Sequence, residues 1–194
     1  DKELSLYPPQ KEVLESGLLE TGFHCVLQMP TGSGKTFLAR HAIQKVLSTG
    51  QKAIYLVPLK ALAAELQNDW SRYFKDNRVG VFTGDFGLPG KPFPIPFEEA
   101  DLLIMTPERL DACTRNWRSH WKWIPSVDLI VVDEFHLLGD AHRGARLEGA
   151  LSRFLRLNPF SRVLGLSATL GNRKELADWL NGVEHSSTWR PIPL

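Results

Sequence analysis

The sequence predicts an α/β domain, a mostly parallel sheet with helices on both faces. Short β-rich runs alternate with helical patterns along the whole chain, which is typical of that layer arrangement. Three of the runs, at 53–57, 102–105 and 129–132, are continuously apolar rather than alternating, as expected for strands buried on both faces. A doubly wound sheet of this kind binds its ligand at the carboxyl ends of its strands.

The strands are predicted first, because they are the most apolar segments. Each begins after a polar or glycine-containing stretch and is rich in Val, Ile, Leu or aromatic residues. The expected strands are 24–28, 53–57, 79–83, 101–105, 128–133 and 162–167. The Pro-rich segment 88–96 cannot join a central strand, because proline has no N–H to donate, and is expected to be a surface loop.

The helices are predicted from apolar residues spaced three and four apart. They are expected at 11–20, 35–48, 59–74, 108–116, 144–157 and 172–181. Thr106 is a suitable N-cap with Pro107 at the first helical position, which leaves N–H groups available to a backbone phosphate. Asn172 and Glu175 resemble a capping box, with Asn in the first role. The sequence contains no repeats and no internal linker, so residues 1–194 are expected to form a single domain.

Composition excludes several classes of protein. A hydrophobic fraction of 43% with 23% charged residues fits an ordinary globular chain rather than a disordered one. No apolar run is long enough to cross a bilayer and residues 1–3 do not resemble a signal peptide, so we expect an intracellular protein, cytoplasmic or nuclear, without a membrane partner. Cys25 and Cys113 give neither a disulfide framework nor a metal cluster, and are expected to be reduced thiols. The net charge of +1 means that any nucleic-acid binding must come from a local patch.

A glycine-rich turn between the first strand and the second helix predicts a nucleotide site. The stretch reads Met29-Pro30-Thr31-Gly32-Ser33-Gly34-Lys35-Thr36. Glycines let backbone N–H groups turn toward an anion, and the helix N-terminus adds partial positive charge. Lys35 is expected to reach the β/γ-phosphates of ATP, and the Thr36 hydroxyl to ligate Mg²⁺. The usual pattern begins with Gly where this chain has Met29, a departure that indicates a subgroup of such loops.

Two carboxylates at the end of a buried strand predict the second half of that site. Asp133 and Glu134 directly follow the apolar run 129–132. A Mg²⁺–ATP enzyme needs one carboxylate near the metal, for which Asp133 is placed, and a base that orients the attacking water, for which Glu134 is the natural candidate.

These residues carry a resemblance to a known family. Asp133-Glu134-Phe135-His136 resembles the DExH box of superfamily-two helicases, and Ser167-Ala168-Thr169 matches their Ser-Ala-Thr motif. Pro58-Leu59-Lys60-Ala61-Leu62 matches motif Ia, and Thr106-Pro107-Glu108-Arg109-Leu110 matches motif Ib. Leu6-Tyr7-Pro8-Pro9-Gln10 is similar to the upstream element whose Gln reads adenine. The segment 136–148 is similar to the Ski-like branch, and 170–172 and 187–194 resemble its archaeal-type DNA-repair members.

The resemblance implies roles for further residues. It implies a RecA-like fold, ATP and Mg²⁺ as cofactors, and a single strand of nucleic acid as partner. DNA is favoured over RNA as that strand, but the sequence leaves both open. It assigns adenine recognition to Gln10. The residues implied for nucleic-acid contact are Pro58, Lys60, Thr106, Pro107 and Arg109. Those implied for coupling the ATP site to nucleic acid are His136, Ser167, Ala168 and Thr169.

The same resemblance implies that this chain is the first of two motor lobes. Nothing after Thr169 resembles the motifs of a second RecA-like lobe, which in this family supplies an arginine finger. Because such a finger is typically worth about 10³–10⁵ in rate, the isolated lobe is expected to be nearly inactive. Two alternatives to a helicase lobe stay open: a double-strand translocase or reverse-gyrase-like motor, and a nucleotide-regulated clamp that does not unwind.

The segment 115–123 admits two interpretations. It holds three tryptophans, Trp117, Trp121 and Trp123, among three formal positive charges and no acid. Aromatic faces beside cations suit stacking on single-stranded nucleic acid. We favour the alternative, in which the tryptophans pack against the domain while Arg and Lys stay solvated.

Overall fold

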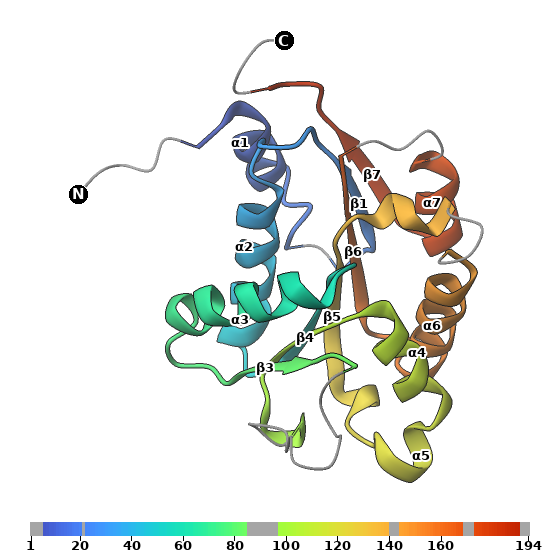
Figure 1. Cartoon of the computed structure of the whole chain (residues 1–194). Helices are drawn as coiled ribbons and strands as arrows, with labels where there is room; N and C mark the ends of the chain where they lie inside the picture. Colours follow the sequence, from blue (N-terminus) through green and yellow to red (C-terminus); the bar gives the residue numbers. More distant parts are fainter. Residues whose placement is uncertain (1–5, 21, 85–96, 140–143, 169–172, 191–194) are drawn as a thin grey trace.

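A computed structural model describes residues 6–20, 22–84, 97–139, 144–168 and 173–190. Their strands form one seven-stranded sheet in the order β3-β4-β2-β5-β6-β1-β7, and every pairing in it is parallel (Figure 1). The strands are β1 (Cys25–Gln28), β2 (Lys52–Leu56), β3 (Val79–Phe82), β4 (Leu102–Met105), β5 (Val127–Val132), β6 (Arg162–Ser167) and β7 (Val183–Ser186).

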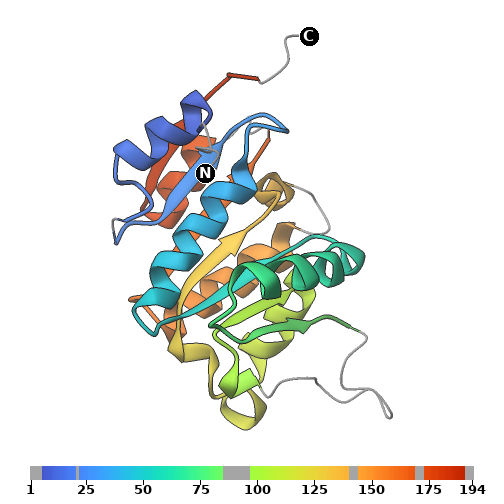
Figure 2. The same cartoon turned by 90° about the vertical axis from the view of Figure 1, so that its left-hand side faces the viewer.

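Helices cover both faces of this sheet. One face carries α1 (Pro8–Glu15), α2 (Lys35–Ser48) and α3 (Lys60–Tyr73). The other face carries α4 (Pro107–Arg115), α5 (Trp117–His120), α6 (Gly144–Leu157) and α7 (Arg173–Leu180), as Figures 1 and 2 show. Three short 3₁₀ helices complete the described chain: η1 (Phe97–Glu99), η2 (Ile124–Ser126) and η3 (Phe135–Gly139).

The two layers of helices explain why the central strands are apolar throughout. Along β5, Leu129 and Val131 join the cluster of buried residues that includes α2, whereas Ile130 and Val132 join the cluster that includes α6. Successive side chains of a strand point to opposite faces, so each strand between two layers needs apolar residues at every position. The predicted α/β fold with a parallel sheet is confirmed.

The structure differs from the sequence predictions at one helix and at two short elements. The helix expected at 11–20 runs from Pro8 to Glu15, because Pro8 occupies its first turn and Gly17, with φ of 70°, follows its end. Neither β7 nor α5 was predicted. The residues of β7 are half-exposed or exposed and include Glu and His, so they lack an apolar run. The Pro-rich loop 88–96 and Asn172 of the expected capping box lie outside the described residues.

Two of the three tryptophans of segment 115–123, and both cysteines, lie in packed surroundings, whereas Trp117 is half-buried with the guanidinium of Arg118 over its ring. Trp123 is buried at 5% exposure and Trp121 packs on Phe82 with ring centroids 5.0 Å apart, as the packing interpretation predicts. Cys25 and Cys113 are both free and buried, and burial raises their thiol pKa values to about 11 and about 12. Among the described residues, no helix is both long and apolar enough to span a bilayer.

A close approach ties the end of β5 to β6. Gly165, in β6, lies against the ring of Phe135, and a β-carbon at position 165 would collide with that ring. Phe135 is fully buried and belongs to η3, which directly follows Asp133 and Glu134. The turn that carries the two carboxylates is therefore packed directly onto the neighbouring strand.

The junction of β1 and β6 makes folding stability depend on pH. The Nδ1 atom of His24 accepts a hydrogen bond from the backbone N–H of Val163, at 3.0 Å, so the imidazole is held neutral. Burial, and secondly the charge of Arg162, lower the pKa of His24 below its ordinary value of 6.5. As the pH falls below about 6.5, His24 of the unfolded chain therefore takes up a proton, whereas His24 of the folded chain stays neutral until a lower pH. Protonation thus favours the unfolded state, and the contribution of His24 to folding stability is lost as the pH falls.

We expect the free energy of unfolding to decrease on acidification from neutral pH toward the folded-state pKa of His24, and His24→Gln to reduce that decrease. Denaturant titrations of both proteins at a series of pH values measure it. His41→Gln, on α2, serves as the control. Parallel stability–pH curves for the native chain and His24→Gln would refute this role for His24.

Candidate functional site

The glycine-rich loop follows β1 and ends in the first turn of α2. Gly32 and Gly34 have φ angles of 81° and 88°, in the left-handed region that favours glycine. Gly34 is the N-cap of α2, so the loop directs the N-terminus of that helix toward the space above it. A β-carbon at position 34 would also collide with the amide of Gln10, which is 6% exposed. Helix α1 thus brings Gln10 directly onto the loop.

Lys35 lies in the first turn of α2 and turns back over the loop. Its ammonium donates to the carbonyl oxygens of Met29, at 2.9 Å, and Pro30, at 3.1 Å. Burial lowers the pKa of Lys35, while the negative charges of Glu134 and Asp133 oppose that effect. The lysine and the two carboxylates predicted as catalytic residues are therefore close enough to interact electrostatically.

The remaining loop residues divide into buried and exposed ones. Ser33 is fully buried and its hydroxyl donates to the carbonyl of Pro30, at 2.6 Å, so it shapes the loop from inside. Thr31, Gly32 and Thr36 are exposed or lie at the surface of the loop, where an anion can reach them. Met29, the departure from the usual glycine, is fully buried in the core beside α2.

Asp133 and Glu134 follow β5 at the same edge of the sheet as the loop, the upper edge in Figure 1. Glu134 has a φ of 52°, which is uncommon for a residue with a β-carbon and is a form of local strain that concentrates at functional sites. Its backbone N–H donates to Asp133 Oδ1, at 3.0 Å. Both side chains are half-buried. Among the described residues no group of three or more His, Cys, Asp or Glu could bind a metal. The hydroxyl of Thr36 and the carboxylate of Asp133, both oxygen ligands of the kind that Mg²⁺ prefers, stay its predicted ligands.

A chain of contacts links Glu134 to the glycine-rich loop. His136 Nδ1 lies 3.2 Å from Glu134 Oε2 and 3.2 Å from Ser167 Oγ. The carbonyl of Ser167, which ends β6, accepts a hydrogen bond from the backbone N–H of Met29, at 2.9 Å. Three of the predicted motifs therefore meet at one residue, Ser167. Ala168 follows it half-buried, and Thr169 lies outside the described residues.

The residues predicted to contact nucleic acid gather at the ends of β2, β3 and β4. Thr106 is the N-cap of α4 and Pro107 its first residue, as predicted, although the Thr106 hydroxyl makes no capping hydrogen bond. Arg109 donates to the carbonyl of Gly84, at 3.0 Å, and lies over the ring of Phe82. Lys60, at the start of α3, approaches the same glycine: a β-carbon at position 84 would lie 2.7 Å from its Nζ. Lys60 of motif Ia and Arg109 of motif Ib thus both lie close to Gly84.

A small cavity lies between these motifs and Asp133. It measures about 20 Å³ and its lining includes Pro58, Pro107, Asp133 and Leu137. The end of β2 contributes Pro58, the start of α4 contributes Pro107, and the turn after β5 contributes Asp133. Asp133 therefore faces the nucleotide loop on one side and the candidate nucleic-acid motifs on the other.

The sequence did not indicate one residue of this site, Tyr55. It lies in β2 at 1% exposure, with its hydroxyl close enough to the carboxylate of Asp133 to interact with it. Burial raises the pKa of Tyr55 far above its ordinary value, and the charge of Asp133 adds to this. The only signal in the sequence is a polar-tipped residue inside an otherwise apolar strand.

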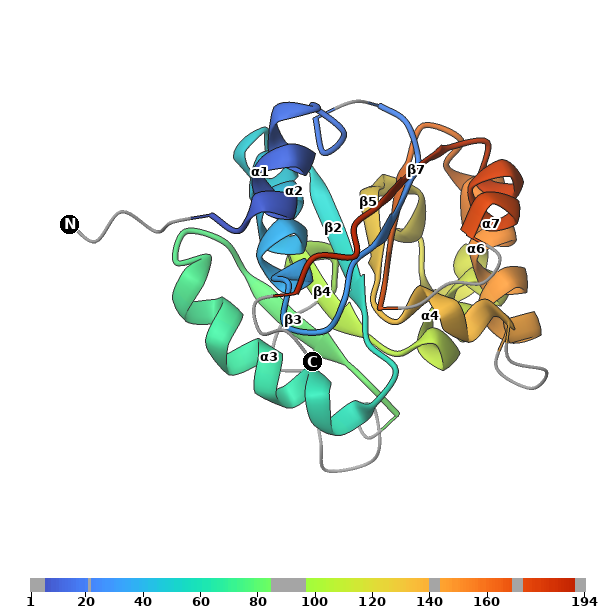
Figure 3. The same ribbon diagram turned by 90° about the horizontal axis from the view of Figure 1, so that it is seen from above.

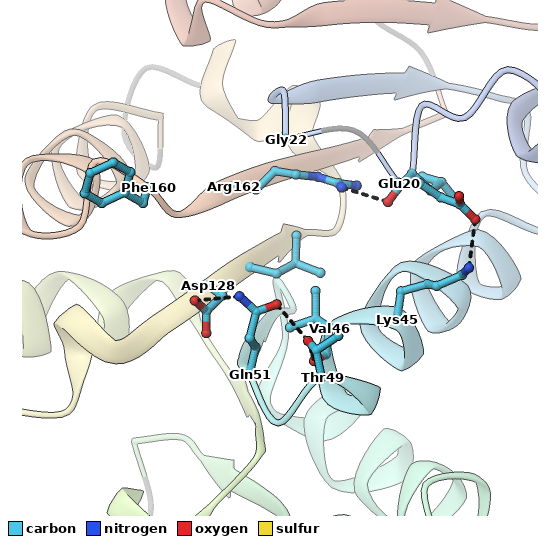
Figure 4. A pocket seen from close by; sticks show the side chains of 11 residues that line it. Glu20, Gly22, Lys45, Val46, Thr49, Gln51, Asp128, Phe160 and Arg162 are labelled. Atoms are coloured by element: carbon cyan, nitrogen blue, oxygen red, sulfur yellow. Dashed lines mark hydrogen bonds and ion pairs between the residues drawn. The ribbon is translucent and has the colours of Figure 1, made fainter.

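A larger cavity, of about 350 Å³, lies at the opposite edge of the sheet (Figure 4). Its lining side chains interact with one another: Glu20 pairs with Lys45 at 2.9 Å, and Gln51 donates to Asp128 at 3.2 Å. Asp128 stands at the start of β5, whereas Asp133 follows its end, so this cavity is separate from the nucleotide loop.

The family model of the DEAD/DEAH box helicases matches residues 7–177. Among similar proteins, the chain is 39% identical to the ATP-dependent DNA helicase Hel308 of Methanocella arvoryzae and 42% identical to that of Pyrococcus abyssi. Each match covers 97% of this chain and 25% of the relative, so the chain spans about a quarter of the length of these relatives.

A solved structure supports the fold. The crystal structure of the DUF1998 helicase MrfA matches with a TM-score of 0.78 over 96% of this chain and 31% of that protein. At 21% identity, this match bears on the fold alone. It agrees with the RecA-like arrangement expected from the sequence.

Proposed function

The chain belongs to the DEAD/DEAH box helicase family, and from that premise we propose that it is the ATP-binding motor lobe of an ATP-dependent DNA helicase. The observation that carries this proposal is the convergence of Lys35, Asp133 and Glu134 at the carboxyl edge of one parallel sheet. Ligands of doubly wound sheets bind at that edge. In this proposal residues 1–194 form one RecA-like lobe, and a second lobe belongs to the longer protein.

The phosphates of ATP would lie on the glycine-rich loop. Backbone N–H groups of Thr31–Lys35 and the N-terminus of α2 supply partial positive charge, and the ammonium of Lys35 would move from the loop carbonyls to the β/γ-phosphates. Thr36 and Asp133 would hold Mg²⁺ through a hydroxyl and a carboxylate oxygen, which are ligands that suit it. When bound, Mg²⁺ neutralises charge on the phosphate oxygens.

Glu134 would orient and deprotonate the attacking water. Its carboxylate is half-buried, and the turn with φ of 52° together with the packing of Phe135 on Gly165 holds it in place. Asp133 itself interacts with the Tyr55 hydroxyl and the Glu134 N–H, so its remaining oxygen lone pairs are the ones available to the metal. Adjacent carboxylates thus take different roles because their partners differ.

The contacts of His136 support its proposed coupling role together with Ser167 and Ala168. A movement of the Glu134 side chain would be passed to Ser167 by His136, which contacts both residues. Ser167 in turn accepts a hydrogen bond from the N–H of Met29, at the start of the glycine-rich loop. Thr106, Pro107, Arg109, Pro58 and Lys60 would contact the sugar–phosphate backbone of a single strand. Such contacts carry no base sequence information. We propose DNA as the strand, because the relatives are named DNA helicases, and we place the activity in the cytoplasm or nucleus.

Adenine selectivity tests the nucleotide site directly. Gln10 is buried against Gly34 and its Oε1 accepts from the backbone N–H of Tyr7, at 2.8 Å, so its amide is held in a fixed position beside the loop. We expect Gln10→Ala to reduce the ratio of ATP to GTP affinity by about fivefold, since a hydrogen bond of this kind contributes ~1 kcal/mol. Calorimetric titration of the chain with each nucleotide and Mg²⁺ measures the ratio.

Gln44→Ala, on the exposed side of α2, is the matched control and should leave both affinities unchanged. An unaltered ATP to GTP ratio in Gln10→Ala would remove the adenine assignment. Absence of ATP binding by the native chain would remove the proposed function as a whole.

A further inference from the structure

An aromatic pair lies beside the candidate nucleotide site. The rings of Tyr7 and Trp189 have centroids 4.9 Å apart and planes tilted by 38°. Tyr7 is 40% exposed and Trp189 is half-buried, so part of the pair's surface faces solvent. The two residues are near opposite ends of the chain, and none of the nucleotide or coupling motifs contains Trp189.

The position of Tyr7 is fixed by the residue proposed to read adenine. Tyr7 is the N-cap of α1, and its backbone N–H donates to Gln10 Oε1. The rigid Pro8 follows it at the first helical position. The side chain of Gln10 also contacts Gly34, so it lies between the Tyr7 backbone and the glycine-rich loop.

The sheet brings Trp189 to the same place. β7 pairs in parallel with β1, and this pairing extends one residue past β7, where the Ser187 N–H donates to the carbonyl of Gln28 at 2.9 Å. Gln28 is the last residue before the glycine-rich loop. The Trp189 N–H donates to Ser187 Oγ, at 3.2 Å, which turns the chain immediately beyond this point. Seen from above, the segment after β7 runs beside the loop that precedes α2 (Figure 3).

We propose that Trp189, supported by Tyr7, is the wall on which the purine base of the nucleotide stacks. This inference rests on the proposed function, which puts the triphosphate on Gly32–Thr36 and the base at Gln10. Gln10 offers hydrogen bonds to the edge of a base, and a partly exposed indole offers a face. Aromatic stacking tolerates either purine, so Trp189 contributes affinity for the base whereas Gln10 contributes the choice of adenine.

The test separates base binding from phosphate binding. Mg²⁺–ATP and Mg²⁺–tripolyphosphate share the phosphate chain, but only ATP carries a base. For Trp189→Ala we expect ATP affinity to fall by about tenfold with unchanged tripolyphosphate affinity, and for Trp189→Phe a loss of less than about threefold, because Phe keeps a stacking face. Calorimetric titration of the 194-residue chain and its variants measures both affinities.

Trp179→Ala is the matched control, because Trp179 is 37% exposed on α7 and α7 covers the opposite face of the sheet from α1. Its affinities for both ligands should equal those of the native chain. If Trp189→Ala weakens both ligands equally, Trp189 only fixes the end of the chain and the proposal is overturned. It is overturned as well if neither affinity changes. A native chain that binds neither ligand would instead refute the proposed function, so the two failures are distinct.

Discussion

Replacing Lys35 by alanine is expected to abolish measurable Mg²⁺–ATP binding while leaving the fold intact. Lys35 is the cation whose ammonium lies over the glycine-rich loop, within electrostatic reach of Asp133 and Glu134, the two carboxylates proposed to be catalytic. A charge-assisted hydrogen bond contributes ~1.5–3 kcal/mol, so its loss weakens binding by about 100-fold at the upper end of that range. Its side chain makes no contribution to the apolar clusters on either face of the sheet. The far-UV spectrum should therefore not change.

Lys45→Ala is the control for this experiment, because Lys45 lies on the same helix but at its far end, where it pairs with Glu20. Calorimetry on both variants, with far-UV circular dichroism, separates loss of the site from loss of the helix. Native-like ATP affinity in Lys35→Ala would remove the central premise of the nucleotide site.

Replacing Glu134 by glutamine is expected to stop hydrolysis and preserve ATP binding. An amide cannot accept the proton of the attacking water, and a positioned general base typically contributes about 10²–10⁴ in rate. Glutamine keeps a side-chain oxygen that can remain near His136, so the contact to Ser167 has no reason to change. Single-turnover hydrolysis needs a longer chain that contains both lobes, since the second is expected to supply the arginine finger.

Glu148→Gln provides the comparison, because Glu148 is an exposed glutamate on α6. That variant should hydrolyse ATP at the native rate. Retained hydrolysis in Glu134→Gln would assign the base to another residue, and loss of ATP binding in the same variant would assign Glu134 to the binding step instead.

The sequence predicted the central strands and the nucleotide motifs because both are encoded locally. A continuous apolar run such as 129–132 fits a strand that is covered by helices on both faces. A glycine turn followed by Lys and Thr at the start of a helix is typical of a phosphate-binding loop. The edge strand β7 was not predictable in the same way. Its exposed Glu184 and half-buried His185 give no apolar pattern, and its place beside β1 follows from tertiary pairing.

The contacts that join the motifs could not be predicted from the sequence either, because they too depend on tertiary structure. His136 and Ser167 are 31 residues apart in the chain, and Met29 and Ser167 are 138 residues apart. No local sequence pattern encodes either contact. The role of Tyr55 beside Asp133 likewise depends on β2 and β5 lying next to each other. The assignments of individual site residues remain predictions that the variants above test.

The hydrogen bonds of Lys35 to its own loop make nucleotide capture a competition. The ammonium is already held by the two carbonyls of Met29 and Pro30, so an incoming anion has to displace them. A triphosphate with its metal offers several oxygens and the helix N-terminus at once, whereas a lone inorganic phosphate or sulfate offers far fewer contacts. If ATP binds there as proposed, the loop would favour long polyphosphates over simple anions. The heat released on binding would then be the difference between two hydrogen-bonded states of Lys35.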